Sequence, residues 1–253
     1  MDLTQAAITG SIAGLTIFIS LPAGRMRNLS NMSRGLADGL AVGILAFLFF
    51  DVVSNTVEPI DSAISAQAAP AYLYMVFALL CGFGISYLGL AYYAKRLHSE
   101  RASDPFRLSF LIAVGIGLHN FGEGLAIGAS ASAGLISLAI LLVIGFAMHN
   151  STEGFGIVAP LMSSVSDVPW LFLFRMGLVG GVPTIIGTIA GFFVVNNIMY
   201  VLLMSTAAGA ILFVVLQLYG VGRTLKSDGS LAVGVFSGFA IALLTDLLVS
   251  AVV

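Results

Sequence analysis

Residues 108–130 read LSFLIAVGIGLHNFGEGLAIGAS, and residues 134–160 read GLISLAILLVIGFAMHNSTEGFGIVAP. Each stretch is long enough to cross a bilayer as a helix, which takes about 20 apolar residues. Each also carries the pattern His-Asn-x-x-Glu-Gly, at His119 to Gly124 and at His149 to Gly154. A charged side chain at the bilayer centre costs about 3 kcal/mol or more, so an intramembrane glutamate indicates a functional residue with a partner nearby. Two His-Glu pairs suggest that this partner is a metal cation.

Composition indicates the same setting for the whole chain. The 253 residues are 59% hydrophobic and 9% charged, with a mean hydropathy of +1.07. Soluble domains average about 45–50% apolar and about 25% charged residues. We therefore expect an all-α polytopic membrane protein that forms a single transmembrane domain over residues 1–253. Its eight expected helices occupy approximately residues 3–23, 36–55, 70–94, 107–130, 134–160, 172–195, 198–220 and 230–252.

The basic residues predict the orientation of these helices. All ten Lys and Arg residues fall in or beside the connections that follow the first, third, fifth and seventh helices. The connections at 56–69, at 131–133 and around 196 have none. Cytoplasmic loops are the ones enriched in Lys and Arg, so both termini are expected outside the cell.

The two motifs are expected to meet near the middle of the bilayer. Their helices run in opposite directions, and each motif lies near the centre of its helix. Because each helical residue advances about 1.5 Å along the axis, the two motifs come to the same depth. Residues four apart share a helical face, so His119 lies with Glu123 and His149 with Glu153. Asn120 and Asn150 lie on nearly the same faces. Imidazole and carboxylate suit Zn, Fe(II), Mn or Co, and the lack of a thiolate argues against Cu(I).

Four further acidic residues are candidates for an ion pathway. Asp51, Glu58 and Asp61 lie at or near the outer end of the second expected helix, where an electronegative mouth would concentrate cations. For Glu58 and Asp61 the alternative is an ordinary solvated loop. Asp246 lies inside the last helix and needs water or a partner there, so it serves either a structural hydrogen bond or the pathway.

The segments HNFGEGLAIG and HNSTEGFGIVAP resemble the motifs of the ZIP (Zrt/Irt-like) divalent metal transporters, particularly the prokaryotic GufA-like branch. GLAVGILAFLFFDV at 39–52 and AAGAILFVV at 207–215 also match that family. The resemblance implies a 3+2+3 inverted-repeat bundle in a prokaryotic cell membrane. It implies transport of Zn, Fe(II), Mn, Co or Cd toward the cytoplasm, with the ion as substrate and no cofactor. The expected partners are the cation and the lipid bilayer, without nucleic acid. A homodimer is expected only because the family often forms one.

The resemblance also implies the ligands. The first metal site would comprise His119, Glu123, His149 and Glu153, and a second would comprise Asn120 and Asn150 with the glutamates bridging. Binuclear members add a glutamate from a Glu-Pro pair, where this chain has Val182. Leu45 replaces a frequent methionine, and Gln217, another pathway candidate, falls where acidic residues are frequent.

Two carboxylates neutralise one divalent ion, and a second ion would leave uncompensated charge in a low dielectric. We therefore expect one ion in a harder, sparser ligand sphere.

Two other classes of function remain open. An intramembrane metallohydrolase would also place His and Glu in helices, but such enzymes typically show His-Glu-x-x-His. That string is absent from this sequence, so we expect a protein that is not an enzyme. A membrane protein that holds a metal without moving it would bind the ion and show no flux.

Overall fold

The computed structural model describes residues 1–26, 30–100, 104–164, 167–193 and 196–250, and within them it contains helices and no strand. Eight described segments are long and apolar enough to cross a membrane. The expectation of an all-α, eight-span membrane protein is confirmed. The helices are α1 (Leu3–Leu15), α2 (Asn31–Ser65), α3 (Ala71–Glu100), α4 (Pro105–Ser132), α5 (Ile136–Ser164), α6 (Trp170–Phe193), α7 (Asn197–Thr224) and α8 (Asp228–Ser250).

Two helices differ most from the ranges predicted by hydropathy. The first span is α-helical only to Leu15, and it continues as two 3-10 turns, η1 (Thr16–Ile19) and η2 (Leu21–Arg25). Pro22 lies in the second turn, where it has no N–H for an α-helical hydrogen bond. Conversely, α2 does not end near residue 55 but continues to Ser65, so Glu58 and Asp61 are helical instead of belonging to a loop. Ile60 of this extension is buried against α3 and α7, which favours continued helix.

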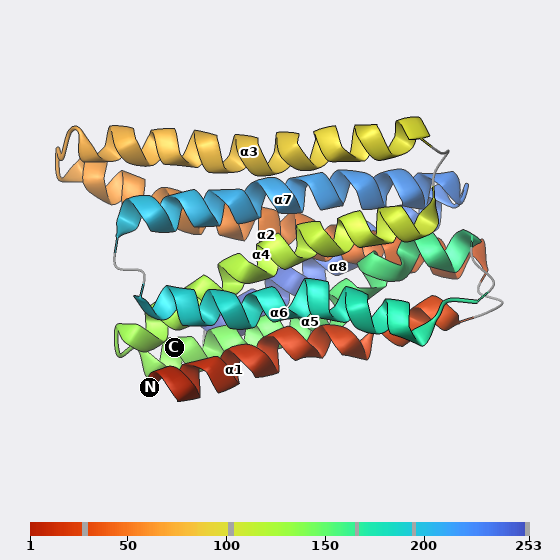
Figure 1. Ribbon diagram of the computed structural model, residues 1–253, viewed down its shortest axis with the longest axis horizontal. Helices are drawn as coiled ribbons and strands as arrows, with labels where there is room; N and C mark the ends of the chain where they lie inside the picture. Colours follow the sequence, from red (N-terminus) through yellow and green to blue (C-terminus); the bar gives the residue numbers. More distant parts are fainter. Residues whose placement is uncertain (27–29, 101–103, 165–166, 194–195, 251–253) are drawn as a thin grey trace.

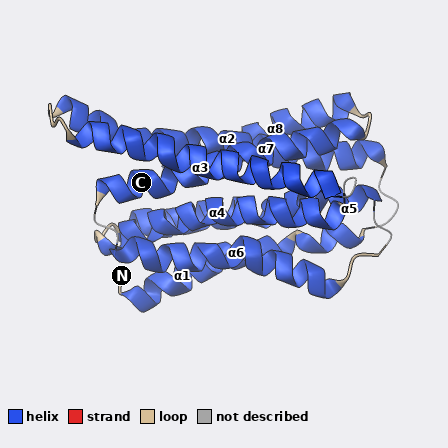
Figure 2. Cartoon of the chain, turned by 45° about the horizontal axis from the view of Figure 1, so that its top comes forward, coloured by secondary structure: helices blue, strands red, loops and turns tan. Residues whose placement is uncertain are grey.

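The helices pack as two groups of four. The first bundle contains α1, α4, α5 and α6, with α4 and α1 both packed on α6. The second bundle contains α2, α3, α7 and α8, with α2 packed on α8 and α3 on α7. Figure 2 shows α2, α3, α7 and α8 lying together beside α4, α6 and α1. The bundles meet mainly where α4 contacts α7 and α5 contacts α2. The start of α1 and the last turns of α8 lie at the same end of the molecule (Figure 1).

Inside each bundle, glycines bring helix backbones into direct contact. A Cβ at Gly43 of α2 would run into the carbonyl oxygen of Val235 on α8. In the first bundle, a Cβ at Gly128 of α4 would run into the carbonyl oxygen of Thr188 on α6. Close backbone approach through small residues is a main source of helix association in membranes. The tightest contacts therefore lie within the bundles.

Replacing Gly43 by leucine is expected to destabilise the protein, because the new side chain would collide with the backbone of α8. Overpacking costs about 1–3 kcal/mol, which should lower the thermal midpoint of the detergent-solubilised protein by roughly 2–12 °C. Gly84→Leu is the matched control, because Gly84 lies on α3, where an added Cβ would meet no described atom within 4 Å. Equal midpoints for the two variants would contradict the close α2–α8 contact.

Candidate metal centre

The two motifs place four ionisable side chains at the meeting of α4 and α5. His119 and Glu123 come from α4, and Glu153 from α5; each is at most 3% exposed. His149, also from α5, is partly buried. The four-residue spacing brings both members of each pair to one helical face. One ligand atom from each of the four lies within 4.8 Å of all the others.

Glu123 is at the centre of this cluster. Its Oε1 lies 3.0 Å from Nε2 of His119 and also contacts Nε2 of His149. Its Oε2 accepts a hydrogen bond of 3.1 Å from Nδ2 of Asn150. Glu153 approaches the same group from the other helix, with its Oε1 3.5 Å from Nε2 of His119. Two imidazoles and two carboxylates therefore converge on one small volume.

Polar atoms of the cluster lack hydrogen-bond partners among the described residues. Nδ1 of His119 has none, and the two oxygens of Glu153 have no such partner other than the Asn120 amide. Buried polar atoms are nearly always paired, and an unpaired group calls for an explanation such as an ion. Imidazole nitrogen and carboxylate oxygen are ordinary ligands of divalent transition metals. The residues present therefore fit one such cation.

The two asparagines hold the motif helices to their neighbours. Nδ2 of Asn120 donates a hydrogen bond of 3.0 Å to the carbonyl oxygen of Gly180 on α6. Nδ2 of Asn150 donates one of 3.2 Å to the carbonyl oxygen of Ala13 on α1. Both side chains are fully buried, and their Oδ1 atoms have no hydrogen-bond partner among the described residues. The amide groups thus position α4 and α5 against α6 and α1.

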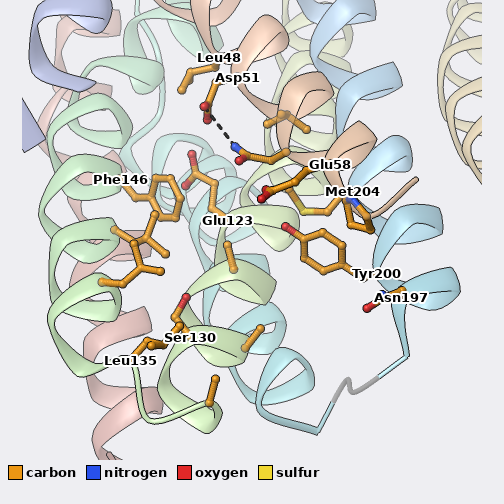
Figure 3. Close-up of a pocket in the computed structure, with 18 of the residues that line it drawn as sticks. Leu48, Asp51, Glu58, Glu123, Ser130, Leu135, Phe146, Asn197, Tyr200 and Met204 are labelled. Atoms are coloured by element: carbon orange, nitrogen blue, oxygen red, sulfur yellow. Dashed lines mark hydrogen bonds between the residues drawn. The ribbon is translucent and has the colours of Figure 1, made fainter. Parts of the chain in front are cut away.

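A cavity of about 450 Å³ reaches the cluster from the end of the molecule where α4 ends and α5 begins. His119 and Glu123 form its inner part. Figure 3 shows Glu123 among the residues that line this cavity. One wall is polar and comes from α2 and α7, including Asp51, Glu58 and Tyr200. The facing wall comes from α4 and α5 and consists mostly of alanine, leucine and phenylalanine side chains. A hydrated cation in this cavity would therefore meet its polar partners on the second bundle.

A second cavity, of about 710 Å³, lies between α2, α5 and α8. It is lined by His149 and Thr152 of α5 and by Asp246 of α8, together with many apolar side chains. Asp51 lines both cavities, and its Oδ1 accepts a hydrogen bond of 3.1 Å from Asn55 (Figure 3). Asp51 is thus the carboxylate at the boundary between the two spaces.

The other pathway candidates are dispersed. Glu58 lines the first cavity, whereas Asp61 lies one turn further along α2, exposed beside a shallow groove. Gln217 is half-buried on α7 and is not among the residues that line either cavity. The structure therefore brings Asp51, Glu58 and Asp246 to cavities near the cluster, and it does not bring Asp61 or Gln217 there.

Asn55, Tyr200 and Met204 are among the residues of the first cavity that sequence reasoning missed. Asn55 follows Asp51 by four residues and precedes Glu58 by three, so the helical spacing of these polar residues could have indicated it. Met204 and Tyr200 share a face of α7 by the same rule, but nothing in the sequence shows that this face meets the cluster. On α2, Leu48 lines the cavity, whereas Leu45 is buried in the core.

The basic residues gather at the opposite end of the molecule. That end holds the last turns of α3 and α7 and the first turn of α4. Lys95, Arg96, Arg107, Arg223 and Lys226 lie there. At the same end, Arg25 pairs with Asp167 at 3.0 Å and contacts the carbonyl oxygen of Val168.

Comparison with known proteins adds one match. Residues 95–218 match the family model of the ZIP zinc transporters. The matched range runs from the last turns of α3 into α7 and includes both His-Asn-x-x-Glu-Gly motifs. A search of curated proteins found no relative of the chain.

Proposed function

Because the chain belongs to the ZIP zinc transporter family, we propose that it carries divalent transition-metal cations across a cell membrane toward the cytoplasm. The observation that carries this proposal is the buried His119, Glu123, His149 and Glu153 cluster at the inner end of a cavity. The ion is the substrate, and the eight helices act as one transporter domain.

The distribution of charge supports the direction. The first cavity leaves the cluster toward the end where α4 ends, and the Lys and Arg residues gather at the other end. Cytoplasmic loops are enriched in basic residues, so the cavity faces the outside. Both termini are then external, and an ion from outside reaches the ligands in this conformation.

Apolar side chains close the route from the cluster toward the basic end. Three residues beyond Glu153, a Cβ at Gly156 would lie 3.1 Å from Cδ1 of Leu218, 3.8 Å from Cβ of Ala41 and 3.9 Å from Cδ1 of Ile116. These three side chains are at most 4% exposed. Release of the ion into the cytoplasm therefore requires a different conformation, as alternating access demands.

The two bundles provide the parts for that change. All four ligands belong to the first bundle, and the close glycine contacts hold each bundle together from within. At Gly115 and Gly156 the nearest atom of the other bundle is instead in a side chain, Val214 and Leu218 respectively. Movement of the first bundle against the second would carry the ion with its ligands from the outer cavity to the cytoplasmic side.

The packing also supports an inverted repeat of three helices, a central pair and three helices. In such a repeat, α1 corresponds to α6, α2 to α7, α3 to α8 and α4 to α5. The contact of α4 with α6 then corresponds to that of α5 with α1, and the contact of α2 with α8 to that of α7 with α3; the structure contains all four. The hydrogen bonds of the two motif asparagines show the same correspondence, since Asn120 donates to a carbonyl oxygen of α6 and Asn150 to one of α1. Inverted repeats are a common basis of alternating access.

Replacing Asp51 by asparagine is expected to raise the metal concentration for half-maximal uptake by about fivefold, with a smaller effect on the maximal rate. The reason is that the carboxylate at the boundary of both cavities attracts the cation before it reaches the ligands. Uptake measured against metal concentration checks this. Asp61→Asn is the matched control, because Asp61 does not line the cavity; an equal effect in both variants would contradict a specific role of Asp51.

Binding of one ion per protomer is expected in a titration of the purified protein. The two buried glutamates supply two negative charges, and a second divalent ion would have no further carboxylate in the cluster. Metal content after removal of excess ion, measured by mass spectrometry, gives the ratio. Two equally tight ions per protomer would refute the single-ion site.

Metal uptake into proteoliposomes tests the function itself. A competition panel of Zn²⁺, Fe²⁺, Mn²⁺, Co²⁺ and Cd²⁺, run with and without a pH gradient, would show which ions move and whether protons take part. Metal and protons compete for the same His and Glu ligands. Binding without accumulation inside the vesicles would instead indicate a membrane protein that holds a metal without transporting it.

A further inference from the structure

The cavity that leads to the cluster contains one type of donor that the His/Glu motifs do not supply. Among the described residues that line it, Met204 of α7 is the one that carries sulfur. The side chain is 4% exposed, so it is enclosed by protein and is not a lipid-facing methionine. A soft thioether therefore lies in the same enclosed space as His119 and Glu123.

The sulfur of Met204 lies against the motif itself. Its Sδ is 3.5 Å from the point where a Cβ of Gly122 would stand. Gly122 directly precedes Glu123 and follows His119 by three residues, so it lies on the flank of the ligand face of α4. A Cβ at this position would lie only 2.8 Å from Cβ of Ala207, so glycine lets α7 approach α4 closely and brings Met204 beside the motif. Methionine is unbranched and has three rotatable bonds, so rotation of its side chain within the cavity can turn Sδ from this flank toward an ion held by His119 and Glu123.

We propose that the Met204 thioether is an additional ligand that favours Zn²⁺ and Cd²⁺ over Mn²⁺. This inference rests on the proposed metal transport and specifies its substrate class. Imidazole and carboxylate alone accept many divalent ions, whereas sulfur ligands select softer ones. The sequence predicts a hard ligand sphere because Leu45 of α2 replaces a methionine. With Met204 of α7 as a sulfur ligand, the sphere is softer than that prediction.

The placement of Met204 also makes this ligand specific to one conformation. The four His and Glu ligands belong to the first bundle, whereas Met204 belongs to the second. An ion in the outward-facing site is therefore bound from both bundles. When the first bundle moves, the ion leaves the thioether behind, which lowers its affinity on the cytoplasmic side and assists release.

X-ray absorption of the Cd²⁺-loaded protein tests the sulfur ligand directly. Wild-type protein is expected to show a Cd–S distance, and Met204→Leu is expected to lose it while keeping the lighter N and O ligands. Leucine conserves volume, so the fold should persist. Met176→Leu is the matched control, because Met176 is also 4% exposed but lies on α6 away from both cavities.

Met148→Leu examines the other nearby sulfur, since Met148 lines the second cavity beside His149. Loss of the Cd–S signal in this variant, or its persistence in Met204→Leu, would overturn the assignment. A wild-type spectrum without sulfur would also overturn it.

Uptake gives the second readout. In vesicles, Met204→Leu is expected to lower the Cd²⁺ to Mn²⁺ uptake ratio by about tenfold, and Met176→Leu to leave it unchanged. An unchanged ratio in Met204→Leu would contradict a role in selectivity. If wild-type vesicles accumulate no metal, the proposed transport fails, whereas the Cd–S signal still decides whether Met204 is a ligand.

Discussion

Replacing Glu123 by glutamine is expected to reduce metal uptake by about 100-fold or more. Glu123 lies against both imidazoles and accepts a hydrogen bond from Asn150, so the change removes the central carboxylate of the cluster. Half of the negative charge available to the ion is lost in a low-dielectric site. Removing one partner of a buried charge pair costs about 3–5 kcal/mol, which exceeds the roughly 2.7 kcal/mol that corresponds to 100-fold. Uptake into proteoliposomes measures the effect.

The fold of this variant can be checked separately. Glutamine has nearly the same shape as glutamate, so the thermal midpoint without metal should not fall. Wild-type protein should gain about 2.7 kcal/mol from metal at 100 times its dissociation constant, and Glu123→Gln should gain little. Asp228→Asn, an exposed change at the start of α8, is the control for handling and reconstitution. Normal uptake by Glu123→Gln would remove this residue from the transport site.

A disulfide between the two bundles is expected to stop transport completely. A Cβ at Gly156 of α5 would lie 3.8 Å from Cβ of Ala41 on α2. This distance suits a disulfide, which needs about 3.5–4.5 Å between Cβ atoms. The pair Gly156→Cys and Ala41→Cys, in a Cys81→Ala background, should therefore be inactive when oxidised and regain uptake after reduction.

A second disulfide within one bundle provides the matched control. A Cβ at Gly35 of α2 would lie 3.6 Å from Cβ of Ser230 on α8, and both helices belong to the second bundle. Oxidation of Gly35→Cys with Ser230→Cys should leave uptake unchanged, because the bundle moves as a unit. Full transport by the oxidised Gly156 and Ala41 pair would contradict movement between the bundles.

The helices were predictable because the bilayer imposes their length and apolarity. The ends of the helices were not predictable, because an apolar segment ends at polar residues whereas the helix can continue through them. Glu58 and Asp61 are polar, yet α2 continues through both because Ile60 between them has packing partners on α3 and α7. At the first span the reverse holds: the sequence remains apolar past Leu15, but the α-helix ends there ahead of Pro22.

The four clustered residues were predictable because a buried charge is costly and the helical spacing fixes their faces. Met204 and Tyr200 were not, because their place in the cavity depends on how α7 is rotated against α4. Asn120 and Asn150 illustrate the same limit. Their positions in the motif suggest ligands, and the structure adds that both amides hold backbone carbonyls of neighbouring helices.

The time course of Zn²⁺ accumulation inside proteoliposomes tests the central claim most directly. Purified wild-type protein should fill the vesicle interior with Zn²⁺ that an ionophore releases, and Glu123→Gln and empty vesicles should not. If wild-type protein binds Zn²⁺ but its vesicles accumulate no more than empty ones, the buried cluster is a metal site without transport, and the protein is not a carrier.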